Sequence, residues 1–412
     1  MQLTLKNYNI YNLDVLQGSL EGVKEGVRWN YIFELTGWCA IGGRNIERII
    51  FEVDDNPISP INVELQDRPD LTANDINGKG FSIWLPFYLF TREVSVCKLK
   101  IIADDGSYYH FVEFELHVNL TKFRRKSQYK EVRIAPLFSM GRSGSSGLMK
   151  LMKDKEYVNI PGTAPYETRA VTYLCARTLL TIRTLSAQFC ANFTDLMFFK
   201  NDMIFFDAPA IAKAQKEEVD AIIVNSALNG LNKGISDYLE MAEEDQYYVE
   251  KISSSGIECL CLLNLLYETK GIVLIRDLRD LICSTRQYKL RFPNSDFTDF
   301  STEQEYKELR AIAQQMICVL KTFPQWHVVR YEEMVKDPGK VSKQLDRYFG
   351  KKAKKKQKRQ TAGGAAEFEK EHVTSETIDL SVGRWKNDAY FMERIEWFNM
   401  YLKDVNEHFG YQ

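Results

Sequence analysis

The sequence predicts an α/β fold, with a parallel sheet flanked by helices, preceded by a small all-β sandwich domain. The prediction rests on a change of pattern near residue 130 of this 412-residue chain. Before that point, short strand-like runs are separated by turn clusters, as in a β-sandwich. Beyond it, strand-like runs alternate with helical ones, which is typical of a parallel sheet. The length also favours more than one hydrophobic core.

The strand-like runs of the first part are rich in β-branched and aromatic residues, and the clearest lie at 29–35, 46–53 and 112–118. Glycine- and aspartate-rich turns separate them, as at Gly42-Gly43 and at 104–106. Several short strands with turns between them indicate a sandwich rather than a helical domain.

The expected domains are a β module at 1–120, a polar, basic linker at 121–130 and an α/β domain at 131–412. The clearest strands of the α/β domain are expected at 132–138, 203–206, 271–275 and 326–330. Helical patterns occur at 148–154, 167–184, 210–228, 257–268, 281–290, 303–322 and 338–349. The basic stretch at 351–370, which contains Gly-Gly-Ala-Ala, predicts a flexible loop.

Composition argues against several classes of protein. The formal net charge is only −2, so the chain as a whole does not attract polyanions, and nucleic acid is not an expected partner. The eight cysteines show no CxxC spacing, so we expect reduced thiols and no metal site. The first residues lack a signal-peptide pattern, and no stretch reaches the roughly 20 apolar residues that span a bilayer. We therefore expect a cytoplasmic protein without stable membrane insertion.

A glycine- and serine-rich motif, MGRSGSSGLM at 140–149, follows an apolar strand and opens a helix. Such a loop directs backbone N–H groups and a helix N-terminus at one point, which makes an anion site. The motif lacks the Gly-Lys-Ser/Thr ending of a Walker A loop. The plain alternative is a turn that caps a helix. The residues expected to hold the anion are Gly141, Arg142, Ser143, Gly144, Ser145, Ser146 and Gly147.

A second strand-to-helix motif, VLIRDLRDLICS at 273–284, offers a second anion site. Arg276 stands at the carboxyl end of the strand, where open α/β sheets bind ligands, and Ser284 follows eight residues later. An arginine with a hydroxyl suits a phosphate group. The plain alternative is a solvated charge cluster at a helix start.

Together these motifs resemble those of the sulfotransferase family that uses 3′-phosphoadenosine-5′-phosphosulfate (PAPS). The 140–149 loop resembles the family's 5′-phosphosulfate loop, and the Arg276-to-Ser284 spacing resembles its 3′-phosphate motif. Two more segments match in order, RYEEMVKDP at 330–338 and SVGRWKND at 381–388. The resemblance covers residues 131–412 and implies a P-loop-like sulfotransferase fold.

The resemblance also implies roles for individual residues. The 140–149 loop would hold the 5′ end of PAPS, and Arg276 and Ser284 would hold its 3′-phosphate. The family's Arg-Lys-Gly triplet is absent, because Ile378-Asp-Leu stands at the comparable place. Arg384 and Lys386 of the fourth motif are its candidate substitutes, and Arg384 and Trp385 are expected to bind the donor. No metal is required by this analogy.

Candidate catalytic residues follow from the same resemblance, because the attacking hydroxyl needs a general base. Glu167 resembles the family's catalytic glutamate, and Lys251 resembles a lysine near the sulfuryl group; Arg142 would add positive charge there. His372 is the alternative base. The plain alternatives are a glutamate that favours the first turn of a helix and an ordinary surface lysine.

The acceptor is expected to be a hydroxyl group on a glycan. The segments around Gly37-Trp38, 66–71 and Gly80-Phe81 resemble β modules attached to bacterial glycan-modifying enzymes. Two other functions stay open at this point. One is a P-loop nucleotide kinase, against which the missing Walker lysine argues. The other is a non-catalytic glycan-binding protein with a degenerate transferase domain, against which the intact arginines argue. The oligomeric state is not predicted.

Overall fold

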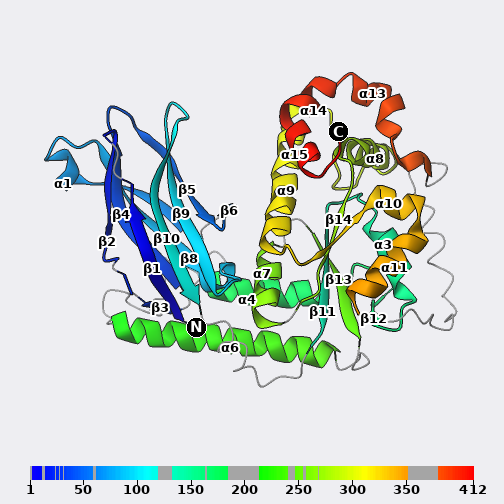
Figure 1. The fold of residues 1–412 in the computed structure, drawn as a ribbon, viewed down its shortest axis with the longest axis horizontal. Helices are drawn as coiled ribbons and strands as arrows, with labels where there is room; N and C mark the ends of the chain where they lie inside the picture. Colours follow the sequence, from blue (N-terminus) through cyan, green and yellow to red (C-terminus); the bar gives the residue numbers. More distant parts are fainter. Residues whose placement is uncertain are drawn as a thin grey trace. The chain divides into compact units, whose positions relative to one another are not determined.

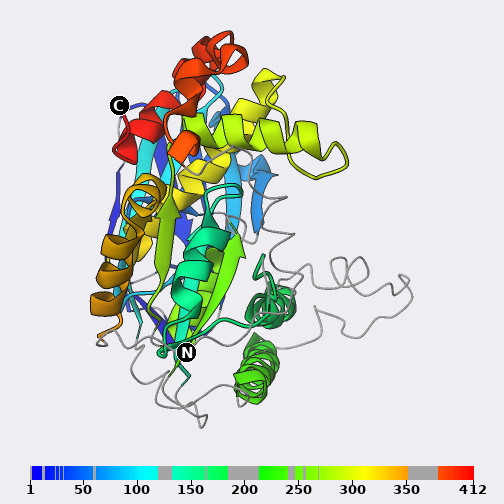
Figure 2. The same ribbon diagram turned by 90° about the vertical axis from the view of Figure 1, so that its right-hand side faces the viewer.

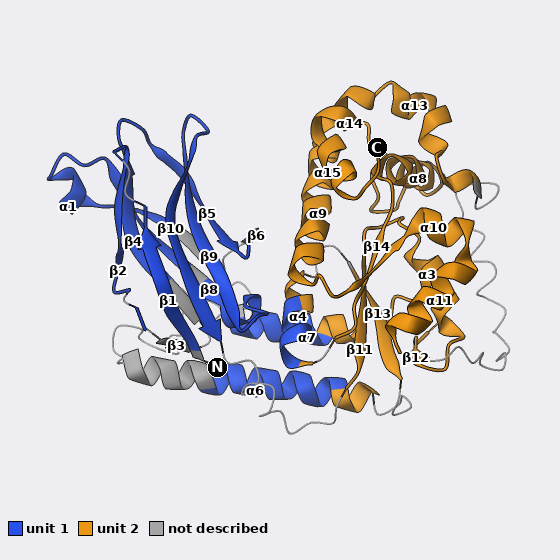
Figure 3. Ribbon diagram, viewed as in Figure 1, with its two compact units in different colours: residues 1–130, 174–235, 261–266 blue, residues 131–173, 236–260, 267–412 orange. Residues whose placement is uncertain are grey.

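The computed structural model separates the chain into two compact units (Figure 3). Unit 1 comprises residues 1–130, 174–235 and 261–266, and unit 2 comprises 131–173, 236–260 and 267–412. The residues that the structure describes are 2–11, 14–23, 25–26, 28–30, 32–58, 62–118, 132–162, 165–183, 213–239, 246–253, 257–267, 269–350 and 379–412.

Unit 1 contains two antiparallel sheets, which confirms the predicted β module (Figure 1). The six-stranded sheet has the order β3-β1-β10-β9-β5-β6 and the four-stranded sheet the order β2-β4-β8-β7. Their bounds are β1 (Gln2–Ile10), β2 (Leu16–Glu21), β3 (Arg28–Asn30), β4 (Ile32–Ile41), β5 (Ile46–Val53), β6 (Asn56–Ile58), β7 (Asn62–Asp67), β8 (Gly78–Pro86), β9 (Val94–Ala103) and β10 (Tyr108–Val118), with α1 (Pro69–Thr72) and η1 (Phe87–Leu89) between strands.

The two sheets pack face to face through residues that alternate along their strands. Along β9, Cys97, Leu99 and Ile101 are fully buried, while the residues between them are partly exposed. Phe81 of one sheet meets Phe111 of the other edge to face, with ring centroids 6.1 Å apart. This period-two pattern and inter-sheet core define the expected sandwich.

Unit 2 is built on a five-stranded parallel sheet in the order β12-β13-β11-β14-β15. The strands are β11 (Ile134–Ser139), β12 (Val158–Asn159), β13 (Tyr247–Ser253), β14 (Ile272–Ile275) and β15 (His327–Arg330). The helices are α3 (Ser145–Lys153), α8 (Leu278–Arg291), α9 (Glu303–Thr322), α10 (Tyr331–Lys336), α11 (Pro338–Tyr348), η4 (Asp379–Ser381), η5 (Arg384–Asn387), α13 (Ala389–Met392), α14 (Ile395–Tyr401) and α15 (Lys403–His408). Three further helices have residues in both units, α4 (Ala170–Arg183), α6 (Lys213–Leu239) and α7 (Ile257–Leu266).

Helices cover both faces of the parallel sheet, which confirms the predicted fold class. Helices α3 and α11 lie on one face and α9 on the other (Figures 1 and 2). Strands β11 and β14 are almost entirely apolar, as expected when both faces are covered; all six residues of β11 are buried. Helix α8 starts at the carboxyl end of β14, and α13 packs against α8 there.

Several predicted elements agree with the structure, and others do not. Helix α9 has the bounds that its pattern predicts. The helix expected from residue 167 begins instead at Ala170, because Arg169 adopts a left-handed φ of 48° that no α-helix accommodates. Strand β13 was not predicted at all. The expected strand at 203–206, the linker at 121–130 and the loop at 351–370 lie outside the described residues.

Two findings concern the described residues as a whole. No helix among them is long and apolar enough to cross a membrane. None of their seven cysteines forms a disulfide, and six of them are buried.

Candidate donor and active site

The four sequence motifs converge in unit 2, at the carboxyl end of the parallel sheet. The first lies between β11 and α3, and the second between β14 and α8. The third joins β15 to α10, and the fourth includes η5. In open α/β sheets this end of the sheet binds ligands. The contacts between the motifs show which of their residues lie together.

The first motif forms a tight loop that opens α3. Arg142 and Gly144 both have left-handed backbone conformations, with φ of 62° and 93°. The Ser143 hydroxyl is turned inward and donates to the Met140 carbonyl at 2.7 Å. No side chain caps the N-terminus of α3. The first-turn N–H groups are therefore available to an anion, as the sequence predicts.

Gly144 is required at its position for two reasons. Its φ of 93° is costly for any residue with a Cβ atom. A Cβ there would also lie 2.4 Å from the ring of Tyr331, which belongs to the third motif. The glycine thus lets the third motif pack directly against the anion loop.

We expect Gly144→Ala to lower the free energy of unfolding by about 2–4 kcal/mol, since backbone strain and overpacking each cost roughly 1–3 kcal/mol. The matched control is Gly147→Ala in the same helix, where the nearest side-chain atom would be 3.6 Å from the new Cβ. We expect that change to be neutral or stabilising by up to about 1 kcal/mol. Urea titration of both variants measures the difference, and equal stabilities would contradict this account of the loop.

Arg276 connects three of the motifs from a buried position. Its side chain leaves the second motif and donates from Nη1 to the Arg142 carbonyl and from Nη2 to the Ser381 carbonyl, each at 2.8 Å. Its guanidinium lies over the Tyr331 ring, 4.2 Å from the centroid. Two of five N–H donors are used in this way, and Nε has no acceptor among the described residues. The remaining donors suit an anionic ligand.

Three arginines of different motifs lie close enough to affect one another. Burial, assisted by the charges of Arg276 and Arg384, lowers the pKa of Arg142 to about 10, against an opposing effect of Tyr288. Burial lowers the pKa of Arg276 as well, and Arg384 contributes in the same direction. Desolvated cations that repel one another are stabilised by an anion between them. This cluster of positive charges suits an anionic ligand.

The fourth motif is held against the second through Asp280. Its carboxylate accepts from the backbone N–H of Gly383 at 2.7 Å and of Trp385 at 3.2 Å. Arg279 covers the Trp385 ring, 4.2 Å from the centroid. Asp280 therefore fixes the segment that carries Arg384.

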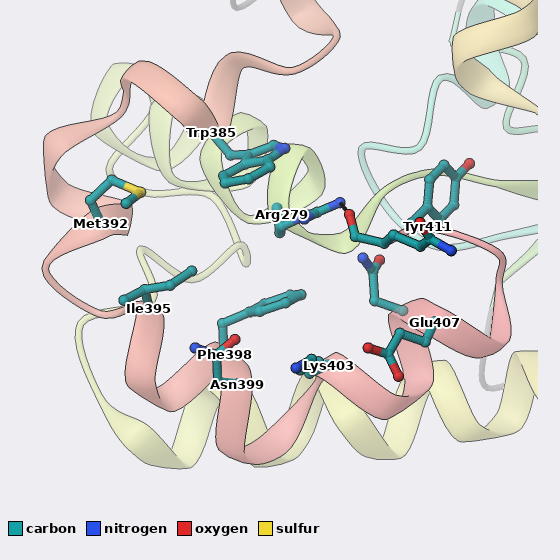
Figure 4. A pocket seen from close by; sticks show the side chains of 11 residues that line it. Arg279, Trp385, Met392, Ile395, Phe398, Asn399, Lys403, Glu407 and Tyr411 are labelled. Atoms are coloured by element: carbon teal, nitrogen blue, oxygen red, sulfur yellow. Dashed lines mark hydrogen bonds between the residues drawn. The ribbon is translucent and has the colours of Figure 1, made fainter.

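Trp385 and Arg279 also line a pocket of about 270 Å³ (Figure 4). Apolar side chains of Met392, Ile395 and Phe398 form much of its wall. Arg279 donates to the Gln412 carbonyl at 2.7 Å across one side of the pocket. The indole ring thus faces an apolar pocket that borders the second motif.

Lys251 reaches the first motif from the neighbouring strand β13. Its ammonium group donates to the Ser146 hydroxyl at 2.8 Å and to the Pro165 carbonyl. Burial lowers the pKa of Lys251 to about 8, while the charge of Glu167 opposes that shift. A lysine with only 6% of its surface exposed, at the start of α3, is placed to contact a group bound by the loop.

Glu167 lies beside Lys251, with 3.7 Å between Glu167 Oε1 and Lys251 Nζ. Its side chain is 44% exposed, and the other carboxylate oxygen accepts from Arg169 at 3.1 Å. The residue lies in the turn before α4, not in a first helical turn. The plain interpretation as a first-turn glutamate is therefore wrong, because the helix starts three residues later.

The remaining predicted residues are placed as follows. Ser284 is buried on α8, and His372 lies outside the described residues. The described residues contain no group of three or more His, Cys, Asp or Glu side chains arranged to hold a metal ion.

Sequence reasoning assigned no role to Tyr331, Asp280 or Tyr288. The first two stand inside quoted motifs, so a signal was present for them. Tyr288 lies in none of the quoted motifs, yet the Arg142 guanidinium lies 4.3 Å from the centroid of its ring.

Comparison with known proteins gives matches only among solved structures. No protein-family model and no curated protein matches the sequence. A sulfotransferase domain from the Synechococcus PCC 7002 olefin synthase is 18% identical, with a TM-score of 0.42 and coverage of 69% of this chain and 97% of that chain. A sulfotransferase domain from the curacin biosynthetic pathway is 16% identical, with a TM-score of 0.37 and coverage of 69% and 99%.

A sulfotransferase from Mycobacterium avium is 12% identical, with a TM-score of 0.32 and coverage of 62% of this chain and 71% of that chain. The solved structures named here are all sulfotransferases or sulfotransferase domains.

Proposed function

We propose that this chain transfers a sulfuryl group from PAPS to a hydroxyl group of a carbohydrate acceptor. The observation that carries the proposal is the position of the buried Arg276, which bonds the Arg142 carbonyl of the first motif and the Ser381 carbonyl of the fourth and so brings Arg142 and Arg384 near it. Such a cluster of positive charges attracts an anion, and PAPS carries anionic groups at two places. The helix start at Ser145 offers the second place.

The donor fits these two places in one orientation. The 5′-phosphosulfate meets the 141–147 loop, where the N–H groups of the α3 N-terminus and the Ser146 hydroxyl are available. The 3′-phosphate meets the free donors of Arg276, with Ser284 and Arg384 as further ligands. Lys251 then lies at the 5′ end, because it contacts Ser146.

The reaction is an in-line displacement at sulfur. The acceptor oxygen forms a bond to sulfur while the bond from sulfur to the 5′-phosphate oxygen breaks, which releases 3′-phosphoadenosine-5′-phosphate (PAP). Glu167 accepts the hydroxyl proton as general base. The ammonium group of Lys251 stabilises the negative charge that develops on the leaving phosphate oxygen. Positioning and charge supply most of the catalysis in such transfers.

Unit 1 is proposed to recognise the acceptor. Every described residue of the four motifs lies in unit 2, which leaves unit 1 without an assigned part in donor binding. A carbohydrate acceptor follows from the resemblance of the sandwich segments to modules of glycan-modifying enzymes. We propose a cytoplasmic location, because buried cysteines without disulfides fit a reducing compartment.

Donor binding is the first test of this proposal. We expect PAP to raise the melting temperature without added metal, because a ligand at 100 times its Kd stabilises a native protein by about 2.7 kcal/mol. ATP with Mg²⁺ should have no comparable effect. A shift with ATP–Mg²⁺ but none with PAP would favour a nucleotide kinase instead.

Transfer itself is tested with ³⁵S-labelled PAPS and a panel of polysaccharide, lipid-linked sugar and phenol acceptors. Label should appear in a carbohydrate acceptor. Label in phenols alone would correct the acceptor class. PAP binding without transfer to any acceptor would favour a non-catalytic binding protein.

A further inference from the structure

Glu250 is a buried carboxylate next to the active site that has no part in the reaction described above. It precedes Lys251 on β13 and is only 3% exposed. Oε1 accepts from the Thr172 N–H at 2.8 Å and the Thr172 hydroxyl at 2.5 Å. Oε2 accepts from the Val171 N–H at 3.0 Å and the Tyr248 hydroxyl at 2.6 Å. Four hydrogen bonds at the start of a helix hold this carboxylate firmly.

The segment 165–172, which carries Glu167, is held at both of its ends by consecutive residues of β13. Adjacent residues of a strand point to opposite faces of the sheet. Lys251 binds the Pro165 carbonyl at one end of the segment, and Glu250 binds the N–H groups of Val171 and Thr172 at the other end. Both anchors belong to β13, so the position of Glu167 between them depends on that one strand.

The backbone between the anchors is strained. Tyr166 and Arg169, the residues on either side of the Glu167-Thr168 pair, have left-handed φ values of 62° and 48°. Residues with a Cβ atom keep such conformations only where their surroundings impose them. The Tyr166 ring is buried in the core of unit 2, which fixes the conformation of Tyr166. The hydrogen bonds of Glu250 to the first turn of α4 restrain the conformation of Arg169.

We propose that Glu250 is a positioning residue, which holds the strained turn so that Glu167 lies beside Lys251. The inference rests on the proposed function for its catalytic consequence but not for its structural one. Without the carboxylate, the first turn of α4 loses two backbone hydrogen bonds, and the turn relaxes toward ordinary φ values. Glu167 then moves away from Lys251.

The structural consequence is tested by hydrogen exchange on Glu250→Gln, which keeps the side-chain shape but offers one acceptor oxygen in place of two. We expect amide exchange of the peptide covering 165–172 to become at least tenfold faster. The matched control is Asp346→Asn, another buried carboxylate of unit 2, which accepts from the Tyr157 hydroxyl at 2.5 Å. That change should leave exchange at 165–172 as in the parent. Unchanged exchange in Glu250→Gln would overturn the proposal.

The catalytic consequence is tested by turnover. We expect kcat of Glu250→Gln to fall roughly 10- to 100-fold, with the Kd for PAP within about threefold of the parent. The double variant Glu167→Gln/Glu250→Gln should be little slower than Glu167→Gln alone, since residues that act through one another are not additive. Multiplicative losses, or a fall in PAP affinity equal to the fall in kcat, would contradict a positioning role.

A milder variant keeps the test decisive if Glu250→Gln does not fold. Thr172→Val removes one hydroxyl donor and leaves the carboxylate in place, and it should shift exchange and kcat in the same directions by smaller factors. No shift in either would overturn the proposal. If the parent protein transfers sulfate to no acceptor, the proposed function is refuted. Faster exchange at 165–172 in Glu250→Gln would still support the positioning role in that case.

Discussion

Glu167→Gln is expected to lower kcat by about 10²- to 10⁴-fold, the usual contribution of a positioned general base. Glutamine keeps the size of the side chain and can still accept a hydrogen bond from Arg169, but it cannot take a proton from the acceptor hydroxyl. The affinity for PAP should stay within about threefold of the parent. Steady-state kinetics with PAPS and the accepted carbohydrate, together with PAP titration calorimetry, measure both quantities.

The control for this change is Glu156→Gln, an exposed glutamate of the same unit. Its kcat should match that of the parent. A loss of less than about tenfold in Glu167→Gln would remove Glu167 from the role of base. His372, the alternative base in the sequence, would then be replaced by alanine next.

The pH dependence of turnover gives an independent check on the Glu167–Lys251 pair. The pKa of Lys251 is about 8, lowered by burial and raised by the Glu167 charge. If its ammonium form assists the leaving group, kcat is highest below about pH 8 and falls as the pH rises through that value. Removing the Glu167 charge lowers the pKa of Lys251, so the basic limb in Glu167→Gln should move to lower pH. A limb that stays in place would show that another group titrates there.

Arg276→Ala is expected to weaken PAP binding by roughly 10- to 150-fold, because a hydrogen bond to a charged group contributes about 1.5–3 kcal/mol. Adenosine 5′-phosphosulfate, which lacks the 3′-phosphate, should lose far less affinity. Some loss is expected for both ligands, because the Arg142 and Ser381 carbonyls lose their donor. Isothermal titration of both ligands gives the ratio of the two losses.

The matched control is Arg279→Ala, which removes the same charge from the same segment. Arg279 is paired with Asp277 at 2.7 Å and makes no hydrogen bond to the Arg142 or Ser381 carbonyl. We expect its effect on PAP affinity to be less than about fivefold. Equal losses for PAP and adenosine 5′-phosphosulfate in Arg276→Ala would show that Arg276 braces the loops without binding the 3′-phosphate.

Strand β13 explains why part of the site could not be predicted. Its sequence is YYVEKIS, and its residues Glu250 and Lys251 are both buried. The neighbouring strand β11 is apolar. A short segment with two adjacent charged residues does not predict a buried strand, because buried charges are costly unless they have hydrogen-bond or ion-pair partners. Here each charge has its partners in segments that lie roughly 80 residues or more away in sequence, at Val171, Thr172, Pro165 and Ser146. Consistency between local pattern and fold is often lost at functional positions.

The turn around Glu167 illustrates the same limit on a smaller scale. A helical pattern was read from residue 167 onward, yet α4 begins at Ala170. The N–H groups of its first turn bond the Glu250 carboxylate, which another element contributes.

The sequence by itself determined the anion loops, the order of the four motifs and the α/β class of the second part. These features are local: a glycine-rich turn between an apolar strand and a helix needs no distant residue to be recognised. Only the tertiary structure decided that Arg276 bonds the Arg142 carbonyl across 134 residues, and that Lys251 and Glu167 are neighbours. Such contacts depend on which strands pair in parallel, and pairing is set by the packing of the whole sheet, which no single segment of sequence contains.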